Sequence, residues 1–384
     1  MTEDRRRTSA GGATFWADAL HHFDAVRRWR GFAMDGMGLG PQESPYGIVL
    51  EQPGVRLRRY EPLPASGPAD LPAVLPAALP AILIVPAPIK RGYIWDLLPH
   101  VSVVRRLAAE GFRVYMTEWT EPGDAEQDFG LADYADRLIG KCVAAIARDG
   151  GGERVFLAGH SLGGTLATLF TSLHADSVRG LVIVEAPLHF GEDGGALARM
   201  VADAPPAATL REAFGNIPGS FLNLVSARAS PREFNWQRRV DMIASLADPR
   251  ALQTHLAVER WTLDEFPIAG RFFEELIEQL YRDDLFARGQ LSIGGRPALP
   301  SRLAAPLLAV IGKGSEIIPP GSMLPVIDAS PADRKLVLDY AGDVGVALQH
   351  VGPLIGRAAH EHLWPQITRW LWEIARSEEA GRSA

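Results

Sequence analysis

Residues 154–173 read RVFLAGHSLGGTLATLFTSL and join a short apolar stretch to a helical pattern through a serine flanked by glycines. The apolar stretch has the length and composition of a buried parallel strand. A sharp turn from strand to helix drives its central residue toward positive φ and leaves little room beside it, which accounts for Gly159 and Gly163. The context therefore predicts that Ser161 is a nucleophile exposed at the end of a strand. The alternative is a glycine-rich turn that contains a serine by chance.

Strand-like stretches recur along the chain and alternate with helical patterns. Between two of them, residues 131–146 place apolar side chains every three or four positions, as an amphipathic helix does. This alternation predicts an α/β protein with a mostly parallel, doubly wound sheet. Besides 154–159, the predicted strands are 81–86, 113–119, 180–187, 306–312 and 335–340.

The long interval 188–303 interrupts this alternation with helical patterns, prolines and aromatic residues. An insertion of that length between two core strands is too long for a loop, so we expect a helical cap. The predicted core then comprises residues 81–187 and 304–376. Residues 1–80 are predicted to form a helix, an extended segment and a Pro/Ala-rich connector.

Composition excludes several classes of function. The 384 residues carry a net charge of −7 and no long basic run, which argues against a nucleic-acid partner. No uninterrupted apolar run reaches the length of about 18 residues that a membrane helix requires. The single cysteine excludes an internal disulfide and fits a reducing cytoplasm. We therefore expect a cytoplasmic protein without a transmembrane segment, and no metal or cofactor is predicted.

A nucleophilic serine needs a base and an orienting acid, which in this topology follow the late strands. His350 lies in the glycine-bounded loop LQHVGPLIG after the last predicted strand and is the predicted base. The predicted acid is Glu316, in the turn KGSEIIPP after the strand 306–312. Asp343 remains an alternative, because it lies in the loop that carries the histidine.

Backbone N–H groups near the serine are candidates to stabilise an oxyanion. Leu162 opens the helix after the serine, where N–H groups lack intrahelical acceptors. The second donor is expected in the loop after the strand 81–86, where Pro86 and Pro88 have no N–H to give. Ile89 is the preferred donor, with Ala87 as the alternative.

Several stretches outside the serine motif resemble the polyhydroxyalkanoate synthases of the α/β-hydrolase superfamily. The resemblance runs from about Tyr46 to Trp372. It implies an α/β-hydrolase fold with a helical cap, supports His350 as the base and places the protein in polyhydroxyalkanoate metabolism. The similar stretches are ILIVPAPIKRGYIWDL (82–97), LLPHVSVVRRLAAEGFRVYMTEWTEP (97–122), LADYADRLIGKCVAAI (131–146), ERWTLDEFPIAG (259–270), LYRDDLFARGQLSIGGR (280–296) and HVGPLIG (350–356).

Two departures from the family pattern concern catalytic groups. The synthases carry cysteine in the motif G-x-C-x-G, where this chain has Ser161, and D-H-I-x-P, where Ser315 stands at the aspartate position. A serine oxyester transfers its acyl group less readily than a cysteine thioester, and water competes as the acceptor. We therefore expect a hydrolase that cleaves a hydrophobic acyl or 3-hydroxyacyl ester or thioester through an acyl-enzyme on Ser161.

Two alternatives to hydrolysis remain open at this point. One is a polyhydroxyalkanoate synthase, an acyltransferase that polymerises 3-hydroxyacyl-CoA. The other is a catalytically inactive, granule-associated relative. The expected partner is a small acyl ester or an acyl-CoA-type substrate, and the resemblance adds a polyester granule surface and a homodimer as further candidates.

Overall fold

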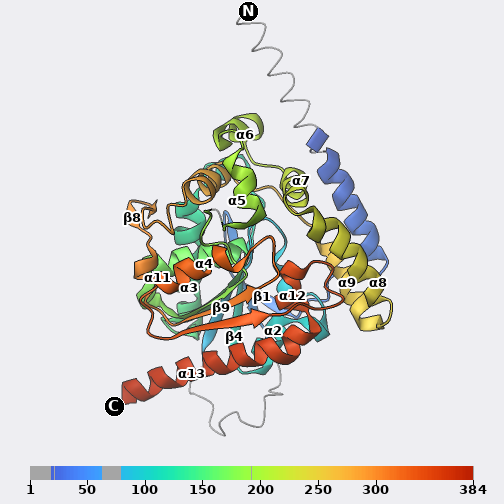
Figure 1. Cartoon of the computed structure of the whole chain (residues 1–384). Coiled ribbons are helices and arrows are strands. Elements are labelled where there is room, and N and C mark those ends of the chain that lie inside the picture. The colour runs from blue at the N-terminus through green and yellow to red at the C-terminus, as the bar shows by residue number, and fades with distance from the viewer. Residues whose placement is uncertain (1–18, 21, 63–78, 192, 384) are drawn as a thin grey trace, which may run out of the picture.

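The computed structural model describes residues 19–20, 22–62, 79–191 and 193–383, and Figure 1 shows how their elements are arranged. Its centre is an eight-stranded sheet with the strand order β1-β2-β4-β3-β5-β6-β9-β10. All neighbouring strands from β4 to β10 pair in parallel. The strands are Tyr46–Gln52 (β1), Val55–Tyr60 (β2), Ala81–Val85 (β3), Arg113–Trp119 (β4), Val155–His160 (β5), Val178–Val184 (β6), Leu307–Gly312 (β9) and Lys335–Tyr340 (β10).

The predicted doubly wound α/β architecture is confirmed. Each of the six predicted core strands is present, with ends that differ from the expected ones by at most a few residues. The predicted extended segment before the core is an antiparallel hairpin of β1 and β2, and it joins the sheet because β2 pairs with β4. Gly54 takes φ 92° at its turn, a conformation that glycine adopts without strain. The predicted Pro/Ala-rich connector falls largely within residues 63–78, outside the described part of the chain.

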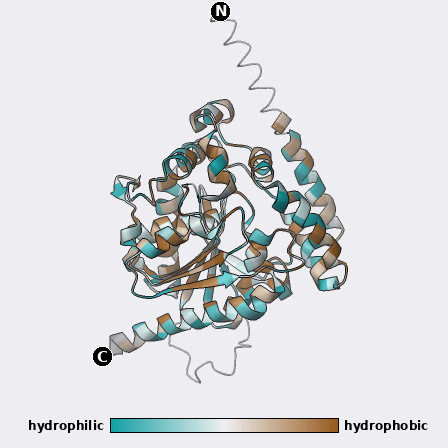
Figure 2. Cartoon of the chain, in the orientation of Figure 1, coloured by the Kyte–Doolittle hydropathy of each residue, from teal (hydrophilic) through white to brown (hydrophobic). Residues whose placement is uncertain are grey.

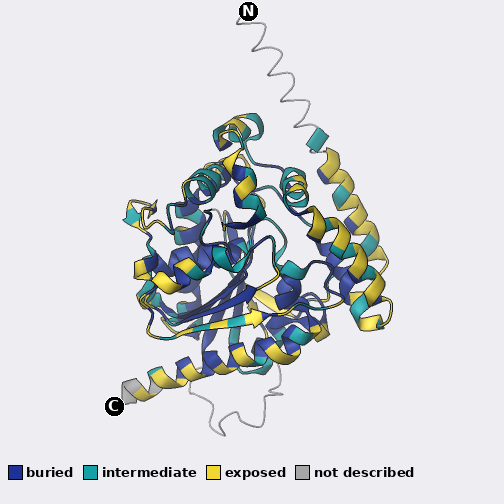
Figure 3. Ribbon diagram, in the orientation of Figure 1, coloured by how far each residue is buried: buried dark blue, intermediate teal, exposed yellow. Residues whose placement is uncertain are grey.

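Both faces of the sheet are covered, which is why its central strands are apolar throughout. In β3, Leu83 and Val85 pack with one hydrophobic cluster, whereas Ile82 and Ile84 pack with the other. Alternate side chains of a strand point to opposite faces, so each cluster corresponds to one face. Figure 2 shows the apolar strands at the centre, and Figure 3 shows that they are buried.

Different helices cover the two faces. The helices α3 (Ile139–Ile146) and α4 (Leu162–Leu173) contribute to the first cluster. The helices α2 (Val103–Ala109), α12 (Gly352–Ile355) and α13 (Trp364–Ser383) contribute to the second. The predicted interruption of the C-terminal helix near Pro365 takes the form of a π-helical turn, Ala359–Leu363, directly before α13.

The 188–303 segment, called the cap segment below, leaves the sheet after β6 and returns at β9. These two strands are parallel hydrogen-bonded neighbours, so the segment starts at the carboxyl end of β6 and returns to the amino end of β9. It is mostly helical and lies above and beside the sheet in Figure 1. Its α-helices are Gly195–Ala202 (α5), Ala207–Phe214 (α6), Gly219–Ala229 (α7), Arg238–Ser245 (α8), Pro249–Trp261 (α9) and Gly270–Glu275 (α10).

The helix formed by residues 22–36 runs along the cap segment (Figure 1). Arg27 contacts Glu265, and Arg260 of α9 pairs with Asp35 at 2.7 Å. These ion pairs join the start of the described chain to the cap segment rather than to the sheet. None of the helices in the described ranges combines the length and apolarity needed to cross a membrane.

Candidate active site

Ser161 lies between β5 and α4 in a backbone conformation that L-residues rarely adopt. Its φ is 54° and its ψ is −136°, and α4 begins at the next residue. A Cβ on Gly159 would lie 2.6 Å from the carbonyl oxygen of Gly163, and one on Gly163 would overlap the carbonyl oxygen of Val85. The glycines are therefore required by close backbone approach, as the sequence pattern predicts.

The Ser161 side chain faces a small cavity of about 110 Å³ beneath the cap segment. His350 lines the same cavity, so the structure brings the predicted nucleophile and the predicted base to one site. Most of the wall is apolar. The other lining residues include Pro86, Ala87, Ile89, Ile94 and Trp95 from the core and Leu197, Ala229, Phe234 and Trp261 from the cap segment.

Glu185 provides the carboxylate that contacts His350. The Nδ1 of His350 lies 3.0 Å from Oε2 of Glu185, whose side chain is 2% exposed. Because an ionised carboxylate only accepts hydrogen bonds, Nδ1 carries the proton, and Nε2 is the nitrogen available to a serine hydroxyl. Glu185 follows β6 directly and has φ 38°. It is a strained residue at the carboxyl end of a core strand, where active-site groups of parallel sheets gather.

The predicted contact between Glu316 and His350 is wrong. The Glu316 side chain is partly exposed, and its carboxylate pairs with Arg232 at 3.0 Å. The alternative acid, Asp343, accepts the backbone N–H groups of Ala358 and Ala359 and so caps the turn that leads into the C-terminal helices. The carboxylate that contacts His350 thus follows β6 rather than β9.

The surroundings of Glu185 are shaped to hold a carboxylate. A Cβ on Gly312 would overlap Oε1 of Glu185, so the glycine that ends β9 makes room for it. Ser315 accepts the backbone N–H of Ile318 at 3.1 Å and lies beside Gly312 on the same turn. Burial raises the pKa of Glu185, the hydrogen bond with His350 opposes this, and the charge of Glu233 raises it further. Glu185 lies within the predicted strand 180–187, so the sequence analysis did not single it out. An acidic residue in the otherwise apolar stretch GLVIVEAP is the signal that could have indicated a functional carboxylate.

His160, the residue before Ser161, contacts the backbone of His350. Its Nε2 lies 2.7 Å from the carbonyl oxygen of His350, and the two rings lie 4.4 Å apart. Burial lowers the pKa of His160 well below its usual value, with a further contribution from the charge of His350. A neutral His160 that faces a carbonyl oxygen donates its Nε2–H, which holds the backbone of the predicted base.

The backbone donors predicted for an oxyanion lie near this cavity. Leu162 is the first residue of α4, and its N–H has no acceptor within the helix. Ile89 and Ala87 both line the cavity, so the geometry leaves both as the second donor. The carbonyl oxygen of Ile89 accepts the N–H of Phe266, which ties this loop to the cap segment.

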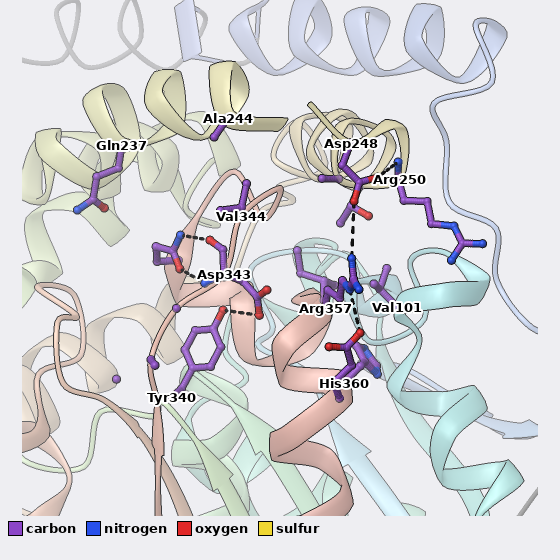
Figure 4. A pocket seen from close by; sticks show the side chains of 18 of the residues that line it. Val101, Gln237, Ala244, Asp248, Arg250, Tyr340, Asp343, Val344, Arg357 and His360 are labelled. Atoms are coloured by element: carbon purple, nitrogen blue, oxygen red, sulfur yellow. Dashed lines mark hydrogen bonds and ion pairs between the residues drawn. The ribbon is translucent and has the colours of Figure 1, made fainter. Parts of the chain in front are cut away.

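A larger cavity of about 1030 Å³ lies on the far side of the acid, and Figure 4 shows it. Glu185, Glu233 and Ser315 line it, together with polar residues of α9 and of the chain before α13. Its charged groups are largely paired, as with Arg357, which contacts Asp248 and Glu361. Within the described residues, no group of three or more His, Cys, Asp or Glu side chains is arranged to hold a metal ion.

Comparison with known proteins identifies the family. Residues 80–346 match the family model described as alpha/beta hydrolase fold. The chain belongs to the α/β hydrolase fold family.

Within this family it is similar to poly(3-hydroxyalkanoate) polymerase subunits PhaC. It is 31% identical to that of Haloferax mediterranei over 88% of this chain and 65% of the relative, and 28% identical to that of Synechocystis sp. over 88% and 85%. The predicted resemblance to polyhydroxyalkanoate synthases is thereby confirmed.

A solved structure supports the fold of this α/β hydrolase family member. A soluble variant of the monoglyceride lipase of Saccharomyces cerevisiae superposes with a TM-score of 0.50 at 13% identity. The superposition covers 87% of this chain and 96% of the lipase. At that identity the likeness concerns the fold alone.

Proposed function

We propose that this protein is a serine-dependent acyltransferase that uses 3-hydroxyacyl thioesters to build a polyester. The observation that carries the proposal is the meeting of Ser161 and His350 at one cavity, with Glu185 in contact with Nδ1 of His350. This arrangement has the nucleophile, the base and the orienting acid that acyl transfer requires. The similarity to PhaC polymerase subunits supports a hydroxyacyl thioester as the substrate.

In the first half-reaction, His350 Nε2 removes the proton of the Ser161 hydroxyl as Oγ attacks the thioester carbonyl carbon. Backbone N–H groups of Leu162 and of Ile89 or Ala87 stabilise the oxyanion. When the C–S bond breaks, His350 gives its proton to the departing thiolate, which leaves the acyl group on Ser161. Glu185 stabilises the imidazolium that exists between these two proton transfers.

In the second half-reaction, the hydroxyl of another hydroxyacyl unit attacks the acyl-serine. His350 takes the proton of that hydroxyl and returns it to Ser161 Oγ as the acyl–serine bond breaks. The product is an ester that is longer by one unit, and the enzyme is restored. This sequence needs no oxidant, reductant or metal.

Hydrolysis is the second candidate, and Ser161 favours it because water can attack an oxyester. Two observations favour transfer instead. The relatives are polymerases, and the cavity above Ser161 is small, apolar and lined by Phe234 and Trp261 of the cap segment. An active site that excludes water protects an acyl-enzyme from hydrolysis. The proposal includes a cytoplasmic location, a polyester granule surface as a partner and a homodimer.

The test is to incubate the purified protein with 3-hydroxybutyryl-CoA and to measure released thiol, free acid and polymer. We expect thiol release matched by polymer, and loss of both in Ser161→Ala. Thiol release matched by free acid would establish hydrolysis instead. Neither product, together with no labelling of Ser161 by a fluorophosphonate, would show an inactive relative and end the proposal.

A further inference from the structure

The loop that carries His350 is held by a carboxylate from the cap segment. Asp241 of α8 is buried, with 8% of its surface exposed. Its Oδ1 accepts the N–H of Gly345 and its Oδ2 accepts the N–H of Ala347, both at 2.8 Å. Oδ2 also lies 2.7 Å from Nδ1 of His255 on α9. One side chain thus binds the loop and joins the two helices of the cap segment that lie nearest to it.

The loop needs such a partner because its backbone is strained. Ala347, three residues before His350, has φ 57°, whereas the φ of 83° at Gly345 is one that glycine adopts without strain. A non-glycine residue at positive φ persists only where its surroundings hold it. Residues 345–348 are buried. Loss of the Asp241 carboxylate would therefore leave the backbone N–H groups of Gly345 and Ala347 without a hydrogen-bond acceptor.

A second carboxylate from the cap segment holds the turn beside Glu185. Glu233 lies in the π-helical turn Arg232–Gln237, directly before α8, and is 3% exposed. Its Oε1 accepts the N–H of Glu316 at 2.9 Å, next to Ser315, which lines the larger cavity together with Glu185. Its Oε2 has no hydrogen-bond partner in the described part of the chain, and Glu233 faces the larger cavity together with Glu185.

From these contacts we infer that Asp241 is a positioning residue for His350, through which the cap segment assembles the catalytic groups as well as covering them. Glu233 does the same for the turn beside Glu185. A displaced cap segment would release the base loop, so His350 would lose its place between Glu185 and Ser161. The inference rests on the proposed function, because it assigns Asp241 an effect on the same acyl transfer.

The charge on Asp241 is present at neutral pH. Burial alone would raise its pKa, but hydrogen bonds from His255 and from the N–H groups of Ala347 and Gly345 outweigh burial, so the pKa is lowered. The tether is therefore intact above the ordinary range of an aspartate and is lost only as pH falls through the lowered value. Asp241→Asn removes this charge and replaces one acceptor oxygen with an NH2 donor, so at every pH one oxygen fewer is available to the N–H groups of Gly345 and Ala347.

The test compares Asp241→Asn with Ser245→Ala in the full chain, using thiol release and the rate of Ser161 labelling by a fluorophosphonate. Ser245 is a matched control because it is buried on the same helix. Its hydroxyl donates to the backbone carbonyl of Asp241 rather than to the loop that carries His350. We expect Asp241→Asn to lower kcat and the labelling rate at least tenfold with KM little changed. Ser245→Ala should retain both rates.

A double-mutant cycle of Asp241→Asn and His350→Ala distinguishes an effect on the position of His350 from a general loss of stability. If Asp241 acts through His350, Asp241→Asn costs nothing further in the His350→Ala background, measured with an activated ester at high enzyme concentration. Equal losses in both backgrounds, or no loss in either, would overturn the inference. Should Asp241→Asn fail to fold, His255→Gln, which removes one partner of Asp241, must show a smaller loss with the same dependence on His350. Failure of the wild type to label would count against the proposed function instead.

Discussion

His350 takes its orientation from two buried neighbours, Glu185 at Nδ1 and His160 at the backbone carbonyl. The contact with Glu185 fixes the tautomer and the rotation of the imidazole ring. The contact with His160 fixes the main chain that carries the ring. Glu185 reaches His350 from the carboxyl end of β6.

Replacement of Glu185 by glutamine separates catalysis from stability. Glu185→Gln should lower kcat by about 10²–10⁴-fold, because the imidazolium loses its carboxylate. Burial raises the pKa of Glu185, so this residue stabilises the fold most at low pH, and the contribution is lost as pH rises through the raised pKa. At neutral pH the variant should thus be at least as stable as the wild type. Turnover and urea unfolding at neutral pH measure the two effects.

The matched control for that variant is Glu316→Gln, which changes a partly exposed carboxylate on the neighbouring turn. It should retain turnover, because its side chain pairs with Arg232 and not with His350. If Glu316→Gln lost more activity than Glu185→Gln, the acid would have to be reassigned to Glu316.

At the scale of elements, the turn between β5 and α4 is set by contacts with β3. α4 begins so close to the end of β3 that Gly163 lies against the main chain of Val85 and Pro86, and Gly164 lies against Ala186. This packing places the N-terminus of α4, with its unpaired N–H groups, beside the serine. The same contacts forbid larger residues, so the local sequence and the interstrand packing depend on each other.

Gly163→Ala tests this packing. The added methyl would overlap the carbonyl oxygen of Val85, so α4 must shift away from β3. We expect a loss of about 3 kcal/mol in the free energy of unfolding, comparable with other overpacked core sites, and loss of activity. Urea denaturation and fluorophosphonate labelling of Ser161 provide the two measurements.

Gly140→Ala in α3 is the matched control. A Cβ there would lie 3.7 Å from Phe170, an ordinary contact, so alanine should stabilise the helix by roughly 0.5–1 kcal/mol. Equal stability changes at Gly163 and Gly140 would show that the turn tolerates a side chain and would contradict the packing argument.

At the scale of the whole molecule, the cap segment, the sheet and the helix formed by residues 22–36 are joined by ion pairs and hydrogen bonds. Lys90, beside the Ser161 cavity, pairs with Glu265 of the cap segment, and Arg27 reaches the same glutamate. Asp241 and Glu233 make the connections to the loops of His350 and Glu316. The cap segment is thereby attached to the loop after β3, to the helix formed by residues 22–36 and to the loops of His350 and Glu316.

Enlarging that cavity should change the fate of the acyl-enzyme. Phe234→Ala removes an aromatic wall of the cavity, so water can enter and longer acyl chains can fit. We expect free acid to rise relative to polymer, and turnover to shift toward longer 3-hydroxyacyl thioesters. Product analysis over a series of chain lengths measures both.

Trp236→Ala is the control for the loss of an aromatic side chain, since Trp236 is two residues away and 66% exposed. It should leave the product ratio and the chain-length preference unchanged. A product ratio that responds equally to both changes would mean that Phe234 does not guard Ser161.

The sequence by itself determined the features that depend on neighbouring residues. Local patterns of apolar residues and glycine predict the strand–serine–helix turn, the core strands and the loop that carries His350, because these patterns reflect backbone geometry over a few residues.

The carboxylate that contacts His350 could not be found in this way. Glu185 and His350 are far apart in the sequence, and they meet only because β6 and the loop after β10 end at the same edge of the sheet. The contacts of Asp241 with the His350 loop likewise exist only after the cap segment folds back onto that edge. Local sequence thus specified the turn that holds Ser161, whereas only long-range packing brings the carboxylates of Glu185 and Asp241 to His350 and its loop.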